Sequence, residues 1–182
     1  MAHSMELNPA FNPAAKPIFL NPPTMMSLPS DQGDQVPSPI YHEGPLVDEL
    51  YLSEAILQVR SGKFGNYFLF VNHKYPEKTL RLYKPSAMQL IKQLPEAFAI
   101  AQKMELQQYP DECNYTVASI NKRNNVEIKL YVQMYQGKAY VFMRMYVEQE
   151  DGTQKPSKYG VQISNQDNIQ TIINFVNKNK WK

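Results

Sequence analysis

The chain has 182 residues, of which 43% are hydrophobic, and a formal net charge of +2. This length leaves room for one large domain or two small ones. Cys113 is the only cysteine, so an internal disulfide and a cysteine-based metal site are excluded. No stretch approaches the ~20 apolar residues of a membrane span, and the N-terminus lacks the charged-then-apolar layout of a signal peptide. We therefore expect an intracellular protein with no membrane partner.

Charge and proline are unevenly distributed along the chain. Residues 1–53 hold one lysine against six carboxylates, whereas residues 113–182 hold ten lysines and arginines against five carboxylates. Nine of the 14 prolines precede residue 46. These features predict a disordered, Pro-rich acidic arm over residues 1–45, with residues 1–4 as a tag remnant. An acidic arm joined to a basic body favours a polyanionic partner, and a chance charge gradient is the alternative.

A first strands-then-helix unit is predicted over residues 46–110. Segments rich in branched and aromatic residues, which favour strands, lie at 55–60, 67–71 and 79–83, within a strand-rich pattern that begins near residue 47. Ser86 offers an N-cap for a helix whose apolar residues follow at helical spacing. Pro95 marks the place where that helix ends or kinks, before an apolar stripe that continues to Met104.

A second unit over residues 111–182 repeats this plan. Strands are predicted at 115–120, 126–135, 139–147 and 159–163, with a polar loop that runs from 150 to 158. Ser164 and Asp167 form a capping box before a helix with one apolar face. The repetition suggests an internal duplication. The expected fold class is α+β: two ββββα units whose curved antiparallel sheets pack through their helices, as a pseudo-dimer within one chain or as a dimer of two chains.

The second unit carries one cluster of candidate functional residues. Its members are cationic or aromatic side chains on the predicted strands and loop: Tyr135, Lys138, Arg144, Lys155 and Lys158. Cations neutralise phosphates and an aromatic ring accepts a base of any identity, so the cluster is typical of single-stranded nucleic-acid binding. The alternative is that the tyrosine packs within a sheet and the lysines are ordinary solvated residues. Arg144, in mid-strand, must face solvent or a partner, because burying it unpaired is costly.

An ungapped signature spans residues 132–163: Val132, Tyr135, Gly137-Lys138, Arg144, Tyr146, Gly152, Lys155-Pro156, Lys158 and Gly160. It resembles the ssDNA-binding domain of the positive-cofactor-four family of transcriptional coactivators. The resemblance extends over roughly residues 113–180, where Lys122 and Arg123 occupy a basic turn of that family. The repeated strands-plus-helix layout is also similar to that of the Pur-type and Whirly-type nucleic-acid binders.

The resemblance implies a strongly curved four-stranded sheet plus helix that pairs with a second copy, each sheet offering a channel for a single strand. The implied contacts are base stacking by Tyr135 and phosphate or base-edge contacts by Lys138, Arg144 and Lys155. Val147 replaces a usual tryptophan, and Gln136 and Tyr159 replace usual lysines; stacking on Tyr159 would partly compensate. The first unit would supply the second sheet, either as a structural partner only or with a half-channel built from Arg60, Lys63, Phe64, Tyr67, Lys74, Lys78 and Arg81.

These observations favour sequence-tolerant binding of single-stranded DNA, or RNA, in transcription or replication. Proteins of those processes are expected as further partners. The expected location is the nucleus or the sites where transcription and replication occur. The alternative is a protein-interaction or scaffold module that keeps the fold without binding nucleic acid. The acidic arm could also occupy the basic groove as an internal nucleic-acid mimic. An enzyme is not expected, nor a metal or cofactor. His3, His42 and His73 form no ligand cluster, and no phosphate-cradling loop or nucleophile elbow is present.

Overall fold

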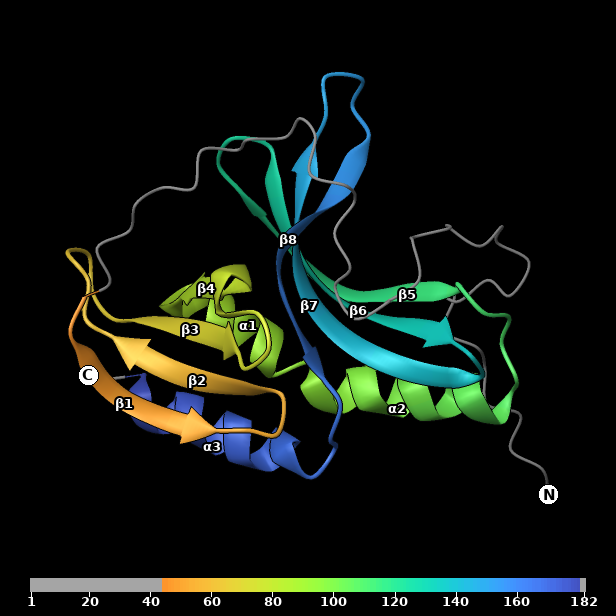
Figure 1. Ribbon diagram of the computed structural model, residues 1–182, viewed down its shortest axis with the longest axis horizontal. Helices are drawn as coiled ribbons and strands as arrows, with labels where there is room; N and C mark the ends of the chain where they lie inside the picture. Colours follow the sequence, from red (N-terminus) through yellow and green to blue (C-terminus); the bar gives the residue numbers. More distant parts are fainter. Residues whose placement is uncertain (1–43, 181–182) are drawn as a thin grey trace.

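The computed structural model describes residues 44–180. Its elements follow in the order β1 (Leu46–Tyr51), β2 (Ala55–Arg60), β3 (Tyr67–Asn72), η1 (Pro76–Lys78), β4 (Leu80–Tyr83), α1 (Lys84–Ile91), α2 (Leu94–Leu106), β5 (Asn114–Lys122), β6 (Val126–Tyr135), β7 (Lys138–Glu148), β8 (Gln154–Ile163) and α3 (Asn168–Asn179). The fold is α+β with two four-stranded antiparallel sheets (Figure 1), which confirms the expected class at this level. The predicted acidic arm falls almost wholly on residues 1–43 and so lies outside the described residues.

Both sheets are simple meanders, in strand orders β1-β2-β3-β4 and β5-β6-β7-β8. Strands β2 and β4 alternate between buried and more exposed side chains, because successive residues of a strand point to opposite faces. On β2, for example, Ala55, Leu57 and Val59 are buried while Gln58 and Arg60 are only half-buried. The buried residues of both sheets and of the helices form one continuous core. We call the core side of each sheet its inner face.

The helices are exchanged between the two sheets. Helix α2 follows the first sheet in the chain, yet it packs against β6 and β7 of the second. Helix α3 follows the second sheet, yet it packs against α1 and β1. Figure 1 shows α2 running along the β5–β7 side of the molecule and α3 lying beside β1 and β2. Each sheet therefore completes its core with a helix from the other half of the chain.

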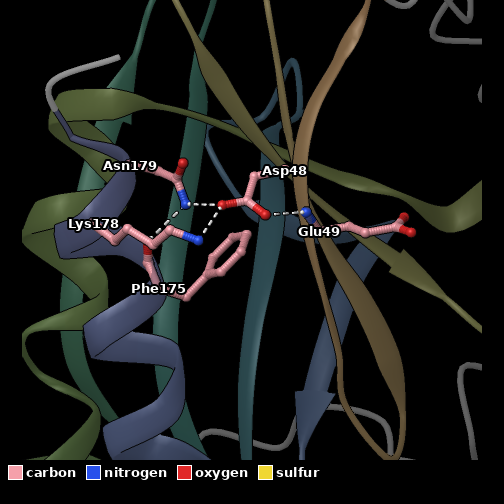
Figure 2. A network of polar contacts seen from close by, with 5 residues as sticks. All are labelled: Asp48, Glu49, Phe175, Lys178 and Asn179. Atoms are coloured by element: carbon pink, nitrogen blue, oxygen red, sulfur yellow. Dashed lines mark hydrogen bonds and ion pairs between the residues drawn. The ribbon is translucent and has the colours of Figure 1, made fainter.

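A polar network fixes α3 against β1 (Figure 2). The Lys178 Nζ lies 2.9 Å from Oδ2 of Asp48, and the buried Asn179 donates through Nδ2 to the same oxygen at 3.0 Å. Asn179 also donates to the carbonyl of Phe175, one helical turn earlier. Hydrogen bonds from Lys178 and Asn179 hold the pKa of Asp48 below its ordinary value. A carboxylate on the first sheet thus anchors the last turn of the C-terminal helix.

Three local predictions were wrong, and in one of them a tertiary contact replaces the expected capping interaction. Helix α1 begins at Lys84, with Tyr83 as its N-cap and Pro85 in its first turn, so Ser86 lies inside the helix rather than capping it. No capping box forms before α3, since Ser164 donates its hydroxyl and its N–H to the carboxylate of Glu54, in the turn between β1 and β2. The polar loop ends at residue 153, because β8 already begins at Gln154.

Other local predictions are confirmed. The strand predicted at 126–135 is β6, and the break predicted at Pro95 falls between α1 and α2, with this proline in the first turn of α2. A proline suits that position, because the first backbone N–H groups of a helix have no partner within it.

Candidate nucleic-acid interface

The side of β6 and β7 that faces away from α2 carries a continuous double row of polar and aromatic side chains. The register pairs these residues across the two strands as Tyr135 with Lys138, Gln133 with Tyr140, Tyr131 with Phe142, Lys129 with Arg144, and Glu127 with Tyr146. We call these ten residues the ladder face. The intervening residues, from Ile128 to Met134 and from Ala139 to Met145, point to the core. Period-two alternation of the sequence therefore separates this face from the hydrophobic interior.

Aromatic rings form the floor of the ladder face. Tyr131, Phe142 and Tyr146 are each only 2–3% exposed and form a second hydrophobic cluster with Tyr140. The Tyr131 ring stacks on Phe142 with centroids 5.3 Å apart and meets Tyr146 edge-on at 6.0 Å. Burial raises the pKa of both tyrosines, so their hydroxyls stay protonated. These rings support the surface, whereas Tyr135 and Tyr140 are only half-buried and keep part of their side chains exposed.

Two cations lie side by side over this floor. Lys129 Nζ is 4.7 Å from the ring centroid of Tyr146 and 3.4 Å from Oε2 of Glu127. Its cross-strand neighbour Arg144 places Cζ 5.8 Å from the centroid of Phe142 and makes no ion pair within residues 44–180. The pKa of Glu127 lies below its ordinary value. Burial acts to raise this pKa, but the hydrogen bonds from Ser119, Gln154 and Lys129 and the charge of Lys129 lower it by more, so the carboxylate stays ionised. The charge of Lys129 is therefore partly neutralised by Glu127, whereas that of Arg144 is not neutralised by an ion pair within residues 44–180.

The ladder face also contains two buried polar atoms that lack a well-formed hydrogen bond within residues 44–180. They are the Nε of Arg144 and the hydroxyl of Tyr146, whose nearest polar neighbour is the Tyr131 hydroxyl, without the geometry of a hydrogen bond. Most buried polar groups in proteins are hydrogen-bonded, and leaving one unpaired costs about 1–3 kcal/mol. Both groups can donate, so an acceptor such as a phosphate or base oxygen is the kind of ligand that would satisfy them.

A glycine makes room for the Arg144 side chain. Gly160 on β8 pairs with Arg144, and a Cβ at this position would lie 2.9 Å from the carbonyl oxygen of Met143 and 3.1 Å from Cβ and Cγ of Arg144. Any larger residue would therefore push against the arginine. The close approach accounts for a glycine at this position of β8.

The β6–β7 turn presents the outer end of the ladder face. Gln136 and Gly137 both adopt positive φ angles, as a two-residue hairpin turn requires. The Gly137 N–H donates to Asp111 at 2.9 Å, and the Ala139 N–H donates to Glu105 of α2 at 2.8 Å. These bonds hold the turn to the body of the protein and leave Lys138 exposed.

The structure brings together some of the predicted site residues and separates others. Tyr135, Lys138 and Arg144 share the ladder face. Lys155, Lys158 and Tyr159 lie on β8, where the register shifts between the pairs of Arg144 with Gly160 and Tyr146 with Pro156. That shift places extra residues in β8 and changes the direction of their side chains. In this segment, Lys158 Nζ lies 5.4 Å from the ring centroid of Tyr159.

The predicted basic turn points elsewhere. Lys122 pairs with Val126, which is adjacent to Glu127 and so faces the opposite side of the sheet from the ladder face. Lys155 pairs with Val147 and belongs to the same opposite side. Arg123 is exposed in the turn itself. Lys122 contacts the first unit instead, with Nζ 5.4 Å from the ring centroid of Tyr83.

Sequence reasoning missed the centre of the ladder face. It did not single out Lys129, Tyr131 or Phe142 as members of the surface. The signal was available: every second residue of 127–135 reads Glu, Lys, Tyr, Gln, Tyr, and every second residue of 138–146 reads Lys, Tyr, Phe, Arg, Tyr. Both rows are polar or aromatic, which is unusual for a face that a helix covers.

The described residues also bear on metal binding, thiol chemistry and membrane spanning. Across residues 44–180, no three His, Cys, Asp or Glu side chains are grouped so that they could hold a metal ion. Burial raises the pKa of the Cys113 thiol, which makes it less nucleophilic. None of the described helices is long and apolar enough to cross a membrane.

No family model and no curated protein sequence matches the chain.

Proposed function

We propose that this protein binds single-stranded DNA, or RNA, on the ladder face, without strong sequence preference. The observation that supports this most directly is Arg144, which is half-buried on an aromatic floor, has a buried Nε without an acceptor, and makes no ion pair in the described part of the chain. Phosphate oxygens are strong acceptors for such a group and carry the complementary charge.

The proposed binding mode combines charge and stacking. Lys138, Arg144 and Lys129 would contact successive phosphates of one strand, and Tyr135 and Tyr140 would each offer a ring to a base. From Lys138 to Arg144 the strand advances six residues, or about 20 Å, so the ladder face is long enough for several nucleotides. Base–aromatic stacking contributes about 1–3 kcal/mol per base and tolerates any base, which accounts for the expected lack of sequence preference.

In this proposal the two units act as a pseudo-dimer inside one chain. The exchange of α2 and α3 between the sheets supports that arrangement, since the helix of each half completes the core of the other. No second copy of the chain is then required to support the ladder face. A role in transcription or replication would follow from the binding of unpaired strands.

The proposal is tested by fluorescence-anisotropy titration of a labelled oligo-dT of about twenty nucleotides, with a duplex of equal length as competitor. We expect binding that prefers the single strand, weakens as salt rises and drops at least about tenfold in Arg144→Ala. Lys92→Ala, which removes an exposed cation at the end of α1, is the matched control and should bind as the wild type does. Absence of single-strand binding even at low salt would refute the proposal.

A protein-interaction role is the second candidate, and one observation favours it. Strand β1 lies at the edge of the first sheet, and its Leu46, Val47 and Tyr51 are 47%, 40% and 65% exposed. An edge strand with exposed apolar side chains is a suitable site for an added strand from another protein. Loss of binding to a protein partner in Val47→Lys, with oligo-dT binding unchanged, would separate the two roles.

A further inference from the structure

The edge strands of the two sheets meet at a group of cations and tyrosines. Strand β4 is one edge of the first sheet and β5 is one edge of the second. Arg81 of β4 lies with Cζ 4.4 Å from the ring centroid of Tyr67, and Lys122 at the end of β5 lies with Nζ 5.4 Å from that of Tyr83. The two rings are themselves neighbours, with centroids 6.3 Å apart. We call Tyr67, Arg81, Tyr83 and Lys122 the junction cluster.

Two like charges are close enough in this cluster to affect each other. Partial burial lowers the pKa of Lys122, and the nearby Arg81 guanidinium lowers it further. Lys122 makes no ion pair within residues 44–180. Both effects disfavour the ammonium form of Lys122. An anion placed between Lys122 and Arg81 would stabilise that form. Tyr83 is 45% exposed beside these charges and offers an open aromatic surface.

From this geometry we infer that the junction cluster binds a nucleotide, with its phosphate between Arg81 and Lys122 and its base against the exposed part of the Tyr83 ring. The inference rests on the proposed function for its ligand class, but it uses other residues and another face. Lys122 points to the side of β5–β6 opposite the ladder face, so a strand reaches the junction cluster only by passing round the β5 edge. Such a strand must be longer than one that fills the ladder face alone.

The shared chemistry, a phosphate next to a base, can come from a bound strand or from a free nucleotide. To separate these sources we would titrate wild-type protein and Lys122→Ala with two labelled oligo-dT probes. One has about six nucleotides, within the size range of known single-strand sites, and the other has about twenty, beyond that range. A third titration follows thymidine 5′-monophosphate by NMR line broadening. Tyr83→Leu keeps an apolar side chain and removes the ring, and Lys92→Ala controls for the loss of one surface charge.

The expected result is a loss of about three- to tenfold in affinity for the longer oligonucleotide in Lys122→Ala and Tyr83→Leu, with no change for the shorter one. Broadening of the mononucleotide by wild-type protein but not by Lys122→Ala would identify a free nucleotide as a ligand of the same cluster. Equal affinity of wild type and both variants for every probe would overturn the inference. The proposed function would survive that outcome as long as Arg144→Ala still weakened binding of both oligonucleotides.

An equal loss for the short and the long oligonucleotide would also overturn the inference, because it would show that Lys122 acts on the ladder face or on the fold. Thermal unfolding of each variant distinguishes those two causes. If no oligonucleotide binds to the wild-type protein, the proposed function itself fails, and this failure is recognised before any variant is compared.

Discussion

Removing the two unpaired cations of the ladder face should change how binding depends on salt. Lys138 and Arg144 make no ion pair within residues 44–180, so each is available to a phosphate. They lie six residues apart on β7, which places them about 20 Å from each other. At that distance the two contacts should be independent, and the effects of Lys138→Ala and Arg144→Ala should add.

The expected magnitude follows from counterion release. Each phosphate neutralised on a single strand contributes about 0.7 to the slope of log affinity against log salt, so the double variant should lose about 1.4 from that slope. Over an approximately fourfold rise in salt, the wild-type affinity should then fall roughly sevenfold further than that of the double variant. Each single variant should show about half of the change in slope.

The assay is fluorescence anisotropy with labelled oligo-dT at four salt concentrations, for wild type, both single variants, the double variant and Lys92→Ala. The control should keep the wild-type slope, because Lys92 lies at the end of α1, away from the ladder face. A double variant that binds more weakly but keeps the wild-type slope would refute the reasoning. Its cations would then act through the fold or through uncharged contacts rather than by neutralising phosphates.

Further predictions concern the framework that supports this face. Asp48→Ala should lower the free energy of unfolding by about 1–3 kcal/mol, because buried Asn179 loses an acceptor; chemical denaturation measures this. The pKa of Asp48 is depressed from 3.8, so its contribution is present above that pH and is lost as pH falls; the wild-type advantage over Asp48→Ala should therefore shrink in acid. Gly160→Ala should weaken oligo-dT binding by displacing Arg144, whereas Gly152→Ala, in an open turn, should not. A fragment of residues 111–182 should lack cooperative unfolding in a thermal melt, because α2 no longer covers β6 and β7; a sharp transition would contradict this.

The parts of the fold that the sequence predicts are those governed by local pattern. Strand β6 was predicted with its observed limits, because its apolar residues alternate strictly with polar or aromatic ones. The capping role expected of Ser164 fails because Glu54, 110 residues away in the chain, accepts its hydrogen bonds. Burial acts to raise the pKa of Glu54, but the hydrogen bonds from Ser164 and Ser53 hold it lower, which favours the ionised acceptor. No local signal reports such a partner.

The candidate site divides in the same way. Alternation alone assigns Tyr135, Lys138 and Arg144 to one face, and the same alternation along β6 assigns Lys129 to it. The position of Lys122 depends on the approach of β5 to β4, which is a contact between the two units. A basic residue in a turn looks the same in sequence whether it faces solvent, a nucleic acid or a tyrosine of another sheet. Its surroundings are fixed only when the sheets pack.

The exchange of helices also bears on what the first unit contributes. The sequence left two alternatives, a half-channel or a structural partner only. Helix α2 of the first unit covers the inner face of β6 and β7, and the ladder face is the other side of these two strands. The first unit therefore supports the ladder face whether or not the first unit itself touches nucleic acid. Glu105 of α2 also accepts a hydrogen bond from Ala139, beside the turn that carries Lys138. The position of the β6–β7 turn therefore depends on residues of both units. A substitution in α2 that shifts this turn should alter binding without contacting the ligand.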